Sequence, residues 1–183
     1  ILSDFRPAMK RTVFYSTATD YPNTVLLQAW KQLLQVPDCT RDALRLDIIT
    51  VGRQLLGNYF LTIKEEFDRM YGQKDPQALK MKAAEMRKLL DELEQLTAFH
   101  SHTSVAGWLS DARAYGDTPE LKDYYEKNAR NLITTWGGSL NDYANRTWAG
   151  LVSHYYAKRW DMYLDAVISA VEENREFSQD ELD

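Results

Sequence analysis

Apolar residues recur three and four positions apart along almost the whole chain, and this spacing restricts the fold more than any other feature. Between Thr40 and Tyr71-Gly72, two apolar sets interleave. One set is Leu44, Ile48, Val51 and Leu55, and the other is Leu46, Ile49, Leu56 and Phe60. In a helix the two sets occupy two faces. This predicts a long central helix that Thr40 caps, that ends at Tyr71-Gly72, and that is buried on both faces.

Capping and breaking signals predict five more helices. Their first residues are Asn23, Asp75-Pro76, Ser104, Thr118-Pro119 and Asp142. The first ends before Pro37, and the last three end at Ala114, at Trp136-Gly137-Gly138 and at Glu173. The second of them carries one apolar stripe, typical of a helix packed against an antiparallel neighbour, formed by Leu79, Ala83, Met86, Leu90 and Leu93. On the fourth helix, three residues are expected to face inward, namely Leu121, Tyr125 and Leu132.

Together these segments predict an all-α fold, an antiparallel helical bundle of about six helices with an extended N-terminal lead-in. We divide the chain into a lead-in over residues 1–22, a helical domain over residues 23–174, and an acidic tail over residues 175–183 that we expect to fray. The chain begins Ile1-Leu2-Ser3 without an initiator Met, so we expect it to be an excerpt from a longer protein.

Composition argues against several classes of partner. A net charge of −5 disfavours nucleic acid and anionic membranes, since both require basic patches. No apolar run is long enough to span a bilayer, and the single Cys39 rules out an internal disulfide framework. Five Trp and eleven Tyr in 183 residues favour a binding surface or an interface.

Residues that often carry chemistry have ordinary settings here. Carboxylates such as Glu65-Glu66, Asp91-Glu92 and Glu94 alternate with Lys and Arg, which indicates solvated helix faces instead of a catalytic pair. The His100-x-His102 pair lacks a carboxylate at helical spacing, and no phosphate-binding loop is present. The sequon that begins at Asn145 falls inside a predicted helix, which favours a structural role for this Asn. We therefore expect no catalytic residue, metal site or cofactor on this chain.

The segment over residues 134–160, TTWGGSLNDYANRTWAGLVSHYYAKRW, is the most distinctive part of the chain. Its tryptophans and tyrosines crowd around Gly137-Gly138, which allow a helix end to bend open. Aromatic faces with polar tips suit the binding of a sugar or a demanding interface. In the alternative reading, Trp136 and Tyr143 only pack the turn between two helices.

An ordered series of motifs resembles the helical C-terminal domain of the α-N-acetylglucosaminidases, glycoside hydrolase family eighty-nine. The series covers roughly residues 23–174 and consists of LDIITVGRQ at 46–54, RKLLDELEQL at 87–96, GWLSDAR at 107–113, DYYEKNAR at 123–130, TWG at 135–137, DYAN at 142–145 and YYAKRW at 155–160.

This resemblance implies a function for a larger protein. Family members hydrolyse terminal α-linked N-acetylglucosamine with retention, using two glutamates on a (β/α)₈ barrel that would lie upstream in the same polypeptide. The chain alone is then expected to be inactive. The resemblance places Trp136 against the sugar as one wall of the pocket, with Asp142 and Tyr143 as further substrate-binding residues.

The implied partners are that catalytic barrel and an N-acetylglucosamine-terminated glycan. The implied location is secreted, periplasmic or lysosomal. Two other classes stay open from the residues themselves. One is a stand-alone helical protein-interaction module, in which Trp136 and the tyrosines form the interface. The other is a complete small enzyme, which is disfavoured because no carboxylate pair has a suitable setting.

Overall fold

The structure is a computed structural model that describes residues 21–37, 40–135, 146–178 and 182. Within these residues the chain forms six α-helices, one 3₁₀ turn and one short π-helix, with no β-strand. In chain order they are α1 (Asn23–Leu34), α2 (Asp42–Gln73), α3 (Pro76–Ala98), η1 (Ser101–Thr103), α4 (Val105–Ala114), α5 (Pro119–Ile133), η2 (Val152–Tyr156) and α6 (Ala157–Glu172). The predicted all-α class is confirmed.

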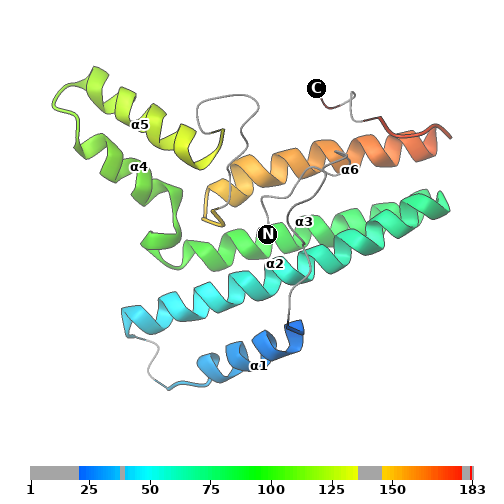
Figure 1. Cartoon of the computed structure of the whole chain (residues 1–183), viewed down its shortest axis with the longest axis horizontal. Coiled ribbons are helices and arrows are strands. Elements are labelled where there is room, and N and C mark those ends of the chain that lie inside the picture. Colours follow the sequence, from blue (N-terminus) through cyan, green and yellow to red (C-terminus); the bar gives the residue numbers. More distant parts are fainter. Residues whose placement is uncertain (1–20, 38–39, 136–145, 179–181, 183) are drawn as a thin grey trace.

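Helices α2, α3 and α6 form the central layer of the molecule (Figure 1). The first two run antiparallel, because contacts join the start of each helix to the end of the other. Glu66 pairs with Lys82 near the turn between them, and Asp42 lies 3.0 Å from His100 at the opposite end. The chain reverses direction at Lys74, which adopts a left-handed φ of 55°.

Helix α6 lies against α3 and also runs antiparallel to it. Arg87 of α3 donates to Asp161 at 2.7 Å and to Asp165 at 2.6 Å, both on α6. On the inner side, Phe60 of α2 meets Trp160 of α6 edge to face, with 5.1 Å between ring centroids. The apolar core of this layer includes Ile63, Phe67, Leu79, Met86, Leu90, Leu93, Leu164 and Val167.

Helix α3 behaves as its sequence predicts. Asp75 is its N-cap and accepts hydrogen bonds from the backbone N–H groups of Gln77 and Ala78, while Pro76 occupies the first helical position. Every member of the predicted stripe is buried, namely Leu79, Ala83, Met86, Leu90 and Leu93. This helix is flanked by α2 on one side and α6 on the other, so both edges of the stripe find a partner.

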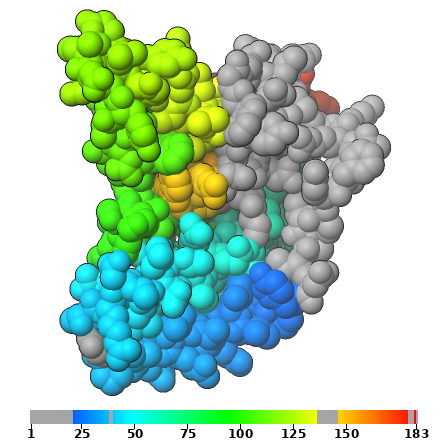
Figure 2. All heavy atoms as spheres, turned by 60° about the vertical axis from the view of Figure 1, so that its left-hand side comes forward, coloured from blue at the N-terminus to red at the C-terminus, as the bar shows by residue number. Residues whose placement is uncertain are grey.

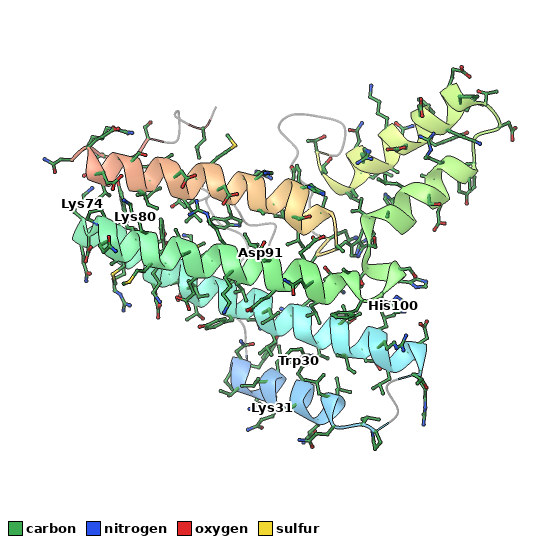
Figure 3. All side chains as sticks on the ribbon, turned by 180° about the vertical axis from the view of Figure 1, so that it is seen from behind. Trp30, Lys31, Lys74, Lys80, Asp91 and His100 are labelled. Carbon is green, nitrogen blue, oxygen red and sulfur yellow. The ribbon has the colours of Figure 1, made fainter. Side chains whose placement is uncertain are left out.

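Helix α1 packs across the N-terminal half of α2. Trp30 lies between the two helices and donates from Nε1 to the carbonyl of Ile48 at 2.9 Å (Figure 3). Of the eight residues expected to be buried on α2, Ile49, Leu55 and Phe60 are buried. The other five are half-buried, since α1 is short and covers this half of α2 only in part.

Two predicted helix N-caps are wrong. Asn23 does not cap α1; its amide donates to the carbonyl of Leu55 and its oxygen accepts from Asn58, both on α2. The N-cap of α2 is Arg41 instead of Thr40, and no side chain caps it. In both cases the sequence pattern located the helix to within two residues, and tertiary contacts decided what its first side chain does.

Helices α4 and α5 form a hairpin that stands away from the central layer (Figure 1). Thr118 caps α5 at its predicted start by accepting from the N–H of Leu121, and Ser104 caps α4 by accepting from the N–H of Ala106. The inward stripe predicted for α5 is wrong. Its members are 37–46% exposed: Leu121, Tyr125 and Leu132. The buried residues of α5 are Ala129 and Ile133, and within the described part of the chain no helix covers the predicted stripe.

The last helical stretch begins later than predicted. The described residues from Arg146 to Trp148 are not helical, and helical structure begins at Leu151. Gly150 has a φ of +85°, and the neighbouring Ala149 forms a bridge with Ser104, so the chain is held away from a helical path before this point.

The expected fraying of the tail is wrong for its first residues. Tyr71 donates from its hydroxyl to Glu176 at 2.7 Å and accepts from the N–H of Phe177 at 3.1 Å. The ring of Phe177 packs perpendicular to that of Tyr163, with 5.5 Å between centroids. This part of the tail therefore closes one end of the α2–α6 core.

Candidate functional site

The three residues predicted to bind the sugar, Trp136, Asp142 and Tyr143, lie outside the described residues. The segment that carries them leaves the described structure at Thr135 and returns at Arg146. The structure therefore specifies the two elements that flank the predicted site.

The first flank is the end of α5. The helix ends at Ile133, close to the predicted end at Trp136. Thr134 donates from its hydroxyl to the carbonyl of Arg130 at 2.7 Å and leaves helical geometry with φ −126° and ψ −87°. The chain direction thus changes directly before Trp136 in sequence.

The second flank is anchored by aromatic rings. Trp148 lies 6.0 Å from Trp108 of α4, centroid to centroid, and the guanidinium of Arg146 lies 5.7 Å from the Trp148 ring. Trp108 donates from Nε1 to the carbonyl of Ala129 on α5 at 3.0 Å. We call these residues, Trp108, Trp148 and Arg146, the tryptophan junction. It connects the α4–α5 hairpin to the segment that follows the predicted sugar-binding residues.

The segment that begins at Arg146 lies in a recessed part of the surface. Figure 2 shows the orange atoms of the segment after residue 146 set back between the α4–α5 hairpin and α2. Within the junction, Trp108 is 37% exposed and Trp148 is half-buried. Partly exposed indole rings in a recess are suited to pack against the apolar face of a ligand ring.

The positive charge of Arg146 also acts on a guanidinium from a distant part of the sequence, that of Arg53. Burial lowers the pKa of Arg53 on α2, and the positive charge of Arg146 lowers it further. Each guanidinium presents up to five N–H donors. Arg146 therefore gives the tryptophan junction N–H donors for carbonyl, hydroxyl or carboxylate oxygens.

Glu94 of α3 holds the backbone that follows the junction. Its two carboxylate oxygens accept from the N–H of Gly150 at 2.7 Å and from the N–H of Ser153 at 3.0 Å. On the other side, Ala149 donates to the carbonyl of Thr103 at 2.8 Å and accepts from the N–H of Val105 at 3.0 Å. The start of the η2–α6 unit is thus fixed by α3 and by the start of α4 together.

Sequence reasoning missed three of these residues. Glu94 was interpreted as part of a solvated face, but it is half-buried and caps a helix 56 positions further along the chain. Arg53 and Trp108 belong to motifs noted in the sequence, yet their proximity to Arg146 and Trp148 depends on tertiary structure. No local signal identifies such partners.

The histidine pair has a structural setting. The N–H of His102 donates to Nδ1 of His100 at 3.1 Å, so Nε2 carries the proton of the neutral ring and donates to Asp42 at 3.0 Å. Figure 3 shows His100 where the end of α3 meets the start of α2. In the described part of the chain no three His, Cys, Asp or Glu residues are grouped so as to hold a metal ion.

The setting of the sequon differs from its prediction. Arg146 and Thr147 are not helical, so the expected helix does not extend through them. Asn145 itself lies outside the described residues, and a structural role for it stays a prediction.

Among the described helices, none is both long enough and apolar enough to cross a membrane.

Comparison with known proteins gives consistent matches. Residues 2–183 match the family described as the alpha-N-acetylglucosaminidase (NAGLU) C-terminal domain. The chain is 32% identical to human alpha-N-acetylglucosaminidase over 173 residues, which cover 92% of this chain and 23% of that protein. It therefore spans about a quarter of the length of this curated relative.

Solved structures match the fold. A family 89 glycoside hydrolase from Clostridium perfringens, in complex with PUGNAc, superposes with a TM-score of 0.83 at 24% identity, covering 92% of this chain and 20% of that one. A substituted form of the enzyme from the same organism, in complex with its substrate GlcNAc-alpha-1,4-galactose, gives a TM-score of 0.80 at 24% identity, covering 91% and 20%. At this identity the likeness establishes the helical fold.

Proposed function

Because the chain belongs to the family of alpha-N-acetylglucosaminidase C-terminal domains, we propose that it is the helical domain of a glycosidase that removes terminal α-linked N-acetylglucosamine from glycans. The observation that carries this proposal is the family match over residues 2–183. The human relative is named for the same activity, and the bacterial relative is described with GlcNAc-alpha-1,4-galactose as its substrate.

The catalytic residues lie elsewhere in this proposal. A retaining glycosidase needs two carboxyl groups about 5 Å apart across the scissile bond, and we assign both to an upstream (β/α)₈ barrel in the same polypeptide. Several described carboxylates instead form ion pairs at the surface, as Glu66 does with Lys82 and Glu126 with Arg113 and Arg130. The chain by itself is therefore inactive.

The domain organisation follows from the same proposal. Residues 1–22 connect the barrel to the helical domain, which spans residues 23–174, and residues 175–183 form the tail. The glycosidase acts outside the cytoplasm, as a secreted, periplasmic or lysosomal enzyme, where its glycans occur.

This domain contributes one wall of the sugar pocket. Trp136 stacks on the apolar face of the N-acetylglucosamine ring, and Asp142 and Tyr143 bind its hydroxyl groups. The geometry of the flanks supports this assignment, because the chain turns at Thr134 and returns at the tryptophan junction.

One observation favours a second function, a helical protein-interaction module. The α4–α5 hairpin exposes two tyrosines strongly, Tyr115 at 79% and Tyr124 at 58%, and both contact the ring of Tyr125. Exposed aromatic clusters of this kind often mark protein interfaces.

The sugar-wall assignment is tested in the full-length enzyme with Trp136→Ala and a chromogenic α-N-acetylglucosaminide. Loss of stacking lowers kcat/KM by about 5- to 150-fold, equivalent to roughly 1–3 kcal/mol by analogy with stacking of bases on aromatic rings, while Tm changes little. A matched control is Trp30→Ala, which removes an indole from the α1–α2 contact. It lowers Tm and leaves KM unchanged.

Two results would count against this assignment. If Trp136→Ala unfolds the domain and the remaining folded enzyme keeps its specific activity, Trp136 is a packing residue. If the isolated chain hydrolyses the substrate, and loses this activity when one of its own carboxylates is substituted, the catalytic assignment to a barrel fails.

A further inference from the structure

Glu94 links the core layer to the backbone at Gly150 and Ser153, which follows the proposed sugar-binding residues in sequence. Its carboxylate projects from α3 and accepts hydrogen bonds from Gly150 and Ser153, which lie 56 and 59 positions later in the sequence. Neither η2 nor α6 has a side-chain cap of its own at its first turn. Glu94 therefore acts as a remote cap for the whole η2–α6 unit.

The charge of Glu94 suits this position. Exposed N–H groups at the start of a helix carry partial positive charge, and a carboxylate that accepts from two of them makes strong, charge-assisted hydrogen bonds. Gly150 has a φ of +85°, which glycine adopts readily, and its N–H donates to Glu94 directly before the first helical turn.

The same short segment is held from the opposite side. Ala149 exchanges two backbone hydrogen bonds with the start of α4, through Thr103 and Val105. Trp148 directly precedes Ala149 in sequence and lies against Trp108 of α4. A shift at Gly150 would therefore move Trp148 and Arg146, which follow the proposed sugar-binding residues in sequence.

We propose that Glu94 is a positioning residue for the sugar-binding wall: its bonds to Gly150 and Ser153 set the place at which that wall returns to the helical layer. This inference rests on the proposed function. Glu94 does not touch the sugar and takes no part in proton transfer. Its effect is on the binding of the N-acetylglucosamine unit, because a small misplacement of a binding group is costly even when the reacting groups are intact.

The test uses the full-length enzyme with the substitutions Glu94→Ala and Glu94→Gln. With a chromogenic α-N-acetylglucosaminide, Glu94→Ala raises KM, and the inhibition constant of free N-acetylglucosamine, by about tenfold each. Glu94→Gln gives a smaller rise in both, because its amide keeps one accepting oxygen. In hydrogen-exchange mass spectrometry of the same proteins, peptides over residues 146–156 exchange faster than in the wild type.

Two controls separate positioning from general destabilisation. Glu92→Ala removes a carboxylate two residues away on α3, where the side chain faces solvent, and it leaves KM unchanged. Val171→Ala opens the core at the far end of α6, where the side chain is 7% exposed. It lowers Tm and also leaves KM unchanged.

Several outcomes would overturn the proposal. It fails if both Glu94 variants keep wild-type KM and inhibition constants while Trp136→Ala raises them, or if Val171→Ala raises KM as much as Glu94→Ala does. If Glu94→Ala does not fold, the KM and the inhibition constant of Glu94→Gln decide the test. If the wild-type full-length protein neither cleaves the substrate nor binds N-acetylglucosamine, the proposed function itself fails, and this inference fails with it.

Discussion

The α2–α3–α6 layer and the α4–α5 hairpin are both made of amphipathic helices, yet they bury very different amounts of their apolar surface. In the layer, side chains such as Phe67 and Leu79 are completely buried. In the hairpin, Leu121 is 43% exposed and Tyr115 is 79% exposed. An apolar stripe is therefore necessary for a helix face to be buried but not sufficient. Whether the stripe is buried depends on a partner that covers it.

The two regions also differ in what holds them together. The layer is joined by apolar contacts around residues such as Phe60 and Leu90. The hairpin is joined by polar contacts: Trp108 of α4 donates to the carbonyl of Ala129 on α5, and Arg113 bridges from α4 to Asp123 and Glu126 on α5. Surface ion pairs stabilise little compared with apolar burial. We conclude that the layer sets global stability and that the hairpin presents a surface.

The largest expected effect comes from opening the layer. Phe67→Ala removes a completely buried ring that lies 6.2 Å from the ring of Tyr163, and we expect a loss of about 3–5 kcal/mol in the free energy of unfolding. Leu121→Ala in the hairpin, where the side chain is 43% exposed, should change it by less than about 0.5 kcal/mol. Urea denaturation measures both. Equal losses would show that the hairpin contributes to global stability as the layer does.

A second comparison uses two glycines. A Cβ at Gly116, in the α4–α5 turn, would lie 2.5 Å from the backbone nitrogen of Lys122, which the chain cannot move cheaply. We expect Gly116→Ala to destabilise the hairpin by about 1–3 kcal/mol. Gly72 lies within α2 with no atom within 4 Å of an added Cβ, so Gly72→Ala should stabilise by about 0.5–1 kcal/mol.

These glycine variants are followed by hydrogen exchange and thermal unfolding. Faster exchange limited to α4 and α5 in Gly116→Ala would support an independently opening hairpin. A matching fall in the protection of α3 would show that the two regions unfold as one unit.

Helix caps give a third, smaller effect. Asp75 caps α3 through its carboxyl group and Thr118 caps α5 through its hydroxyl, and replacing either by Ala should cost about 1 kcal/mol. The cost of Asp75→Ala should appear in global unfolding, whereas that of Thr118→Ala should appear as faster exchange of α5 alone. Identical exchange patterns in the two variants would contradict the division between layer and hairpin.

The smallest effect is a dependence on pH. Hydrogen bonds from Lys74 and Tyr71 lower the pKa of Glu176, and those from Arg130 and Arg113 lower the pKa of Glu126. A lowered pKa in the folded state means that each group stabilises the fold above its unfolded value of about 4.3. That contribution is lost as the pH falls through the folded value.

Carbon NMR titration of the two carboxyl groups measures these pKa values directly. Both should titrate below an ordinary glutamate, and Lys74→Met should return Glu176 toward its usual range without affecting Glu126. If Glu126 shifts as well, the tail and the hairpin are coupled electrostatically.

Local chemistry explains the features that could be predicted. Asp75, Ser104 and Thr118 cap their helices because each side chain reaches a backbone N–H only two or three residues away. The order of family motifs likewise identified the domain without any coordinates, since the family match extends over residues 2–183.

Features that depend on distant partners could not be predicted. Asn23 bonds to α2 instead of capping α1, because Asn58 and the carbonyl of Leu55 lie within reach only after α1 has packed. The spacing of apolar residues alone predicts that the stripe of α5 faces inward, but the structure leaves this stripe exposed. The role of Trp136, which lies outside the described residues, stays a prediction.

By itself, the sequence determined the helical class, the buried stripe of α3 and the family. It also located most helix ends to within a few residues. These depend on periodicity and on hydrogen bonds between near neighbours. Only the tertiary structure decided that α5 is left open, that Trp108 meets Trp148, and that Glu94 caps a helix 56 residues away. Such contacts join groups whose separation along the chain is large, and no local pattern encodes which of them will meet.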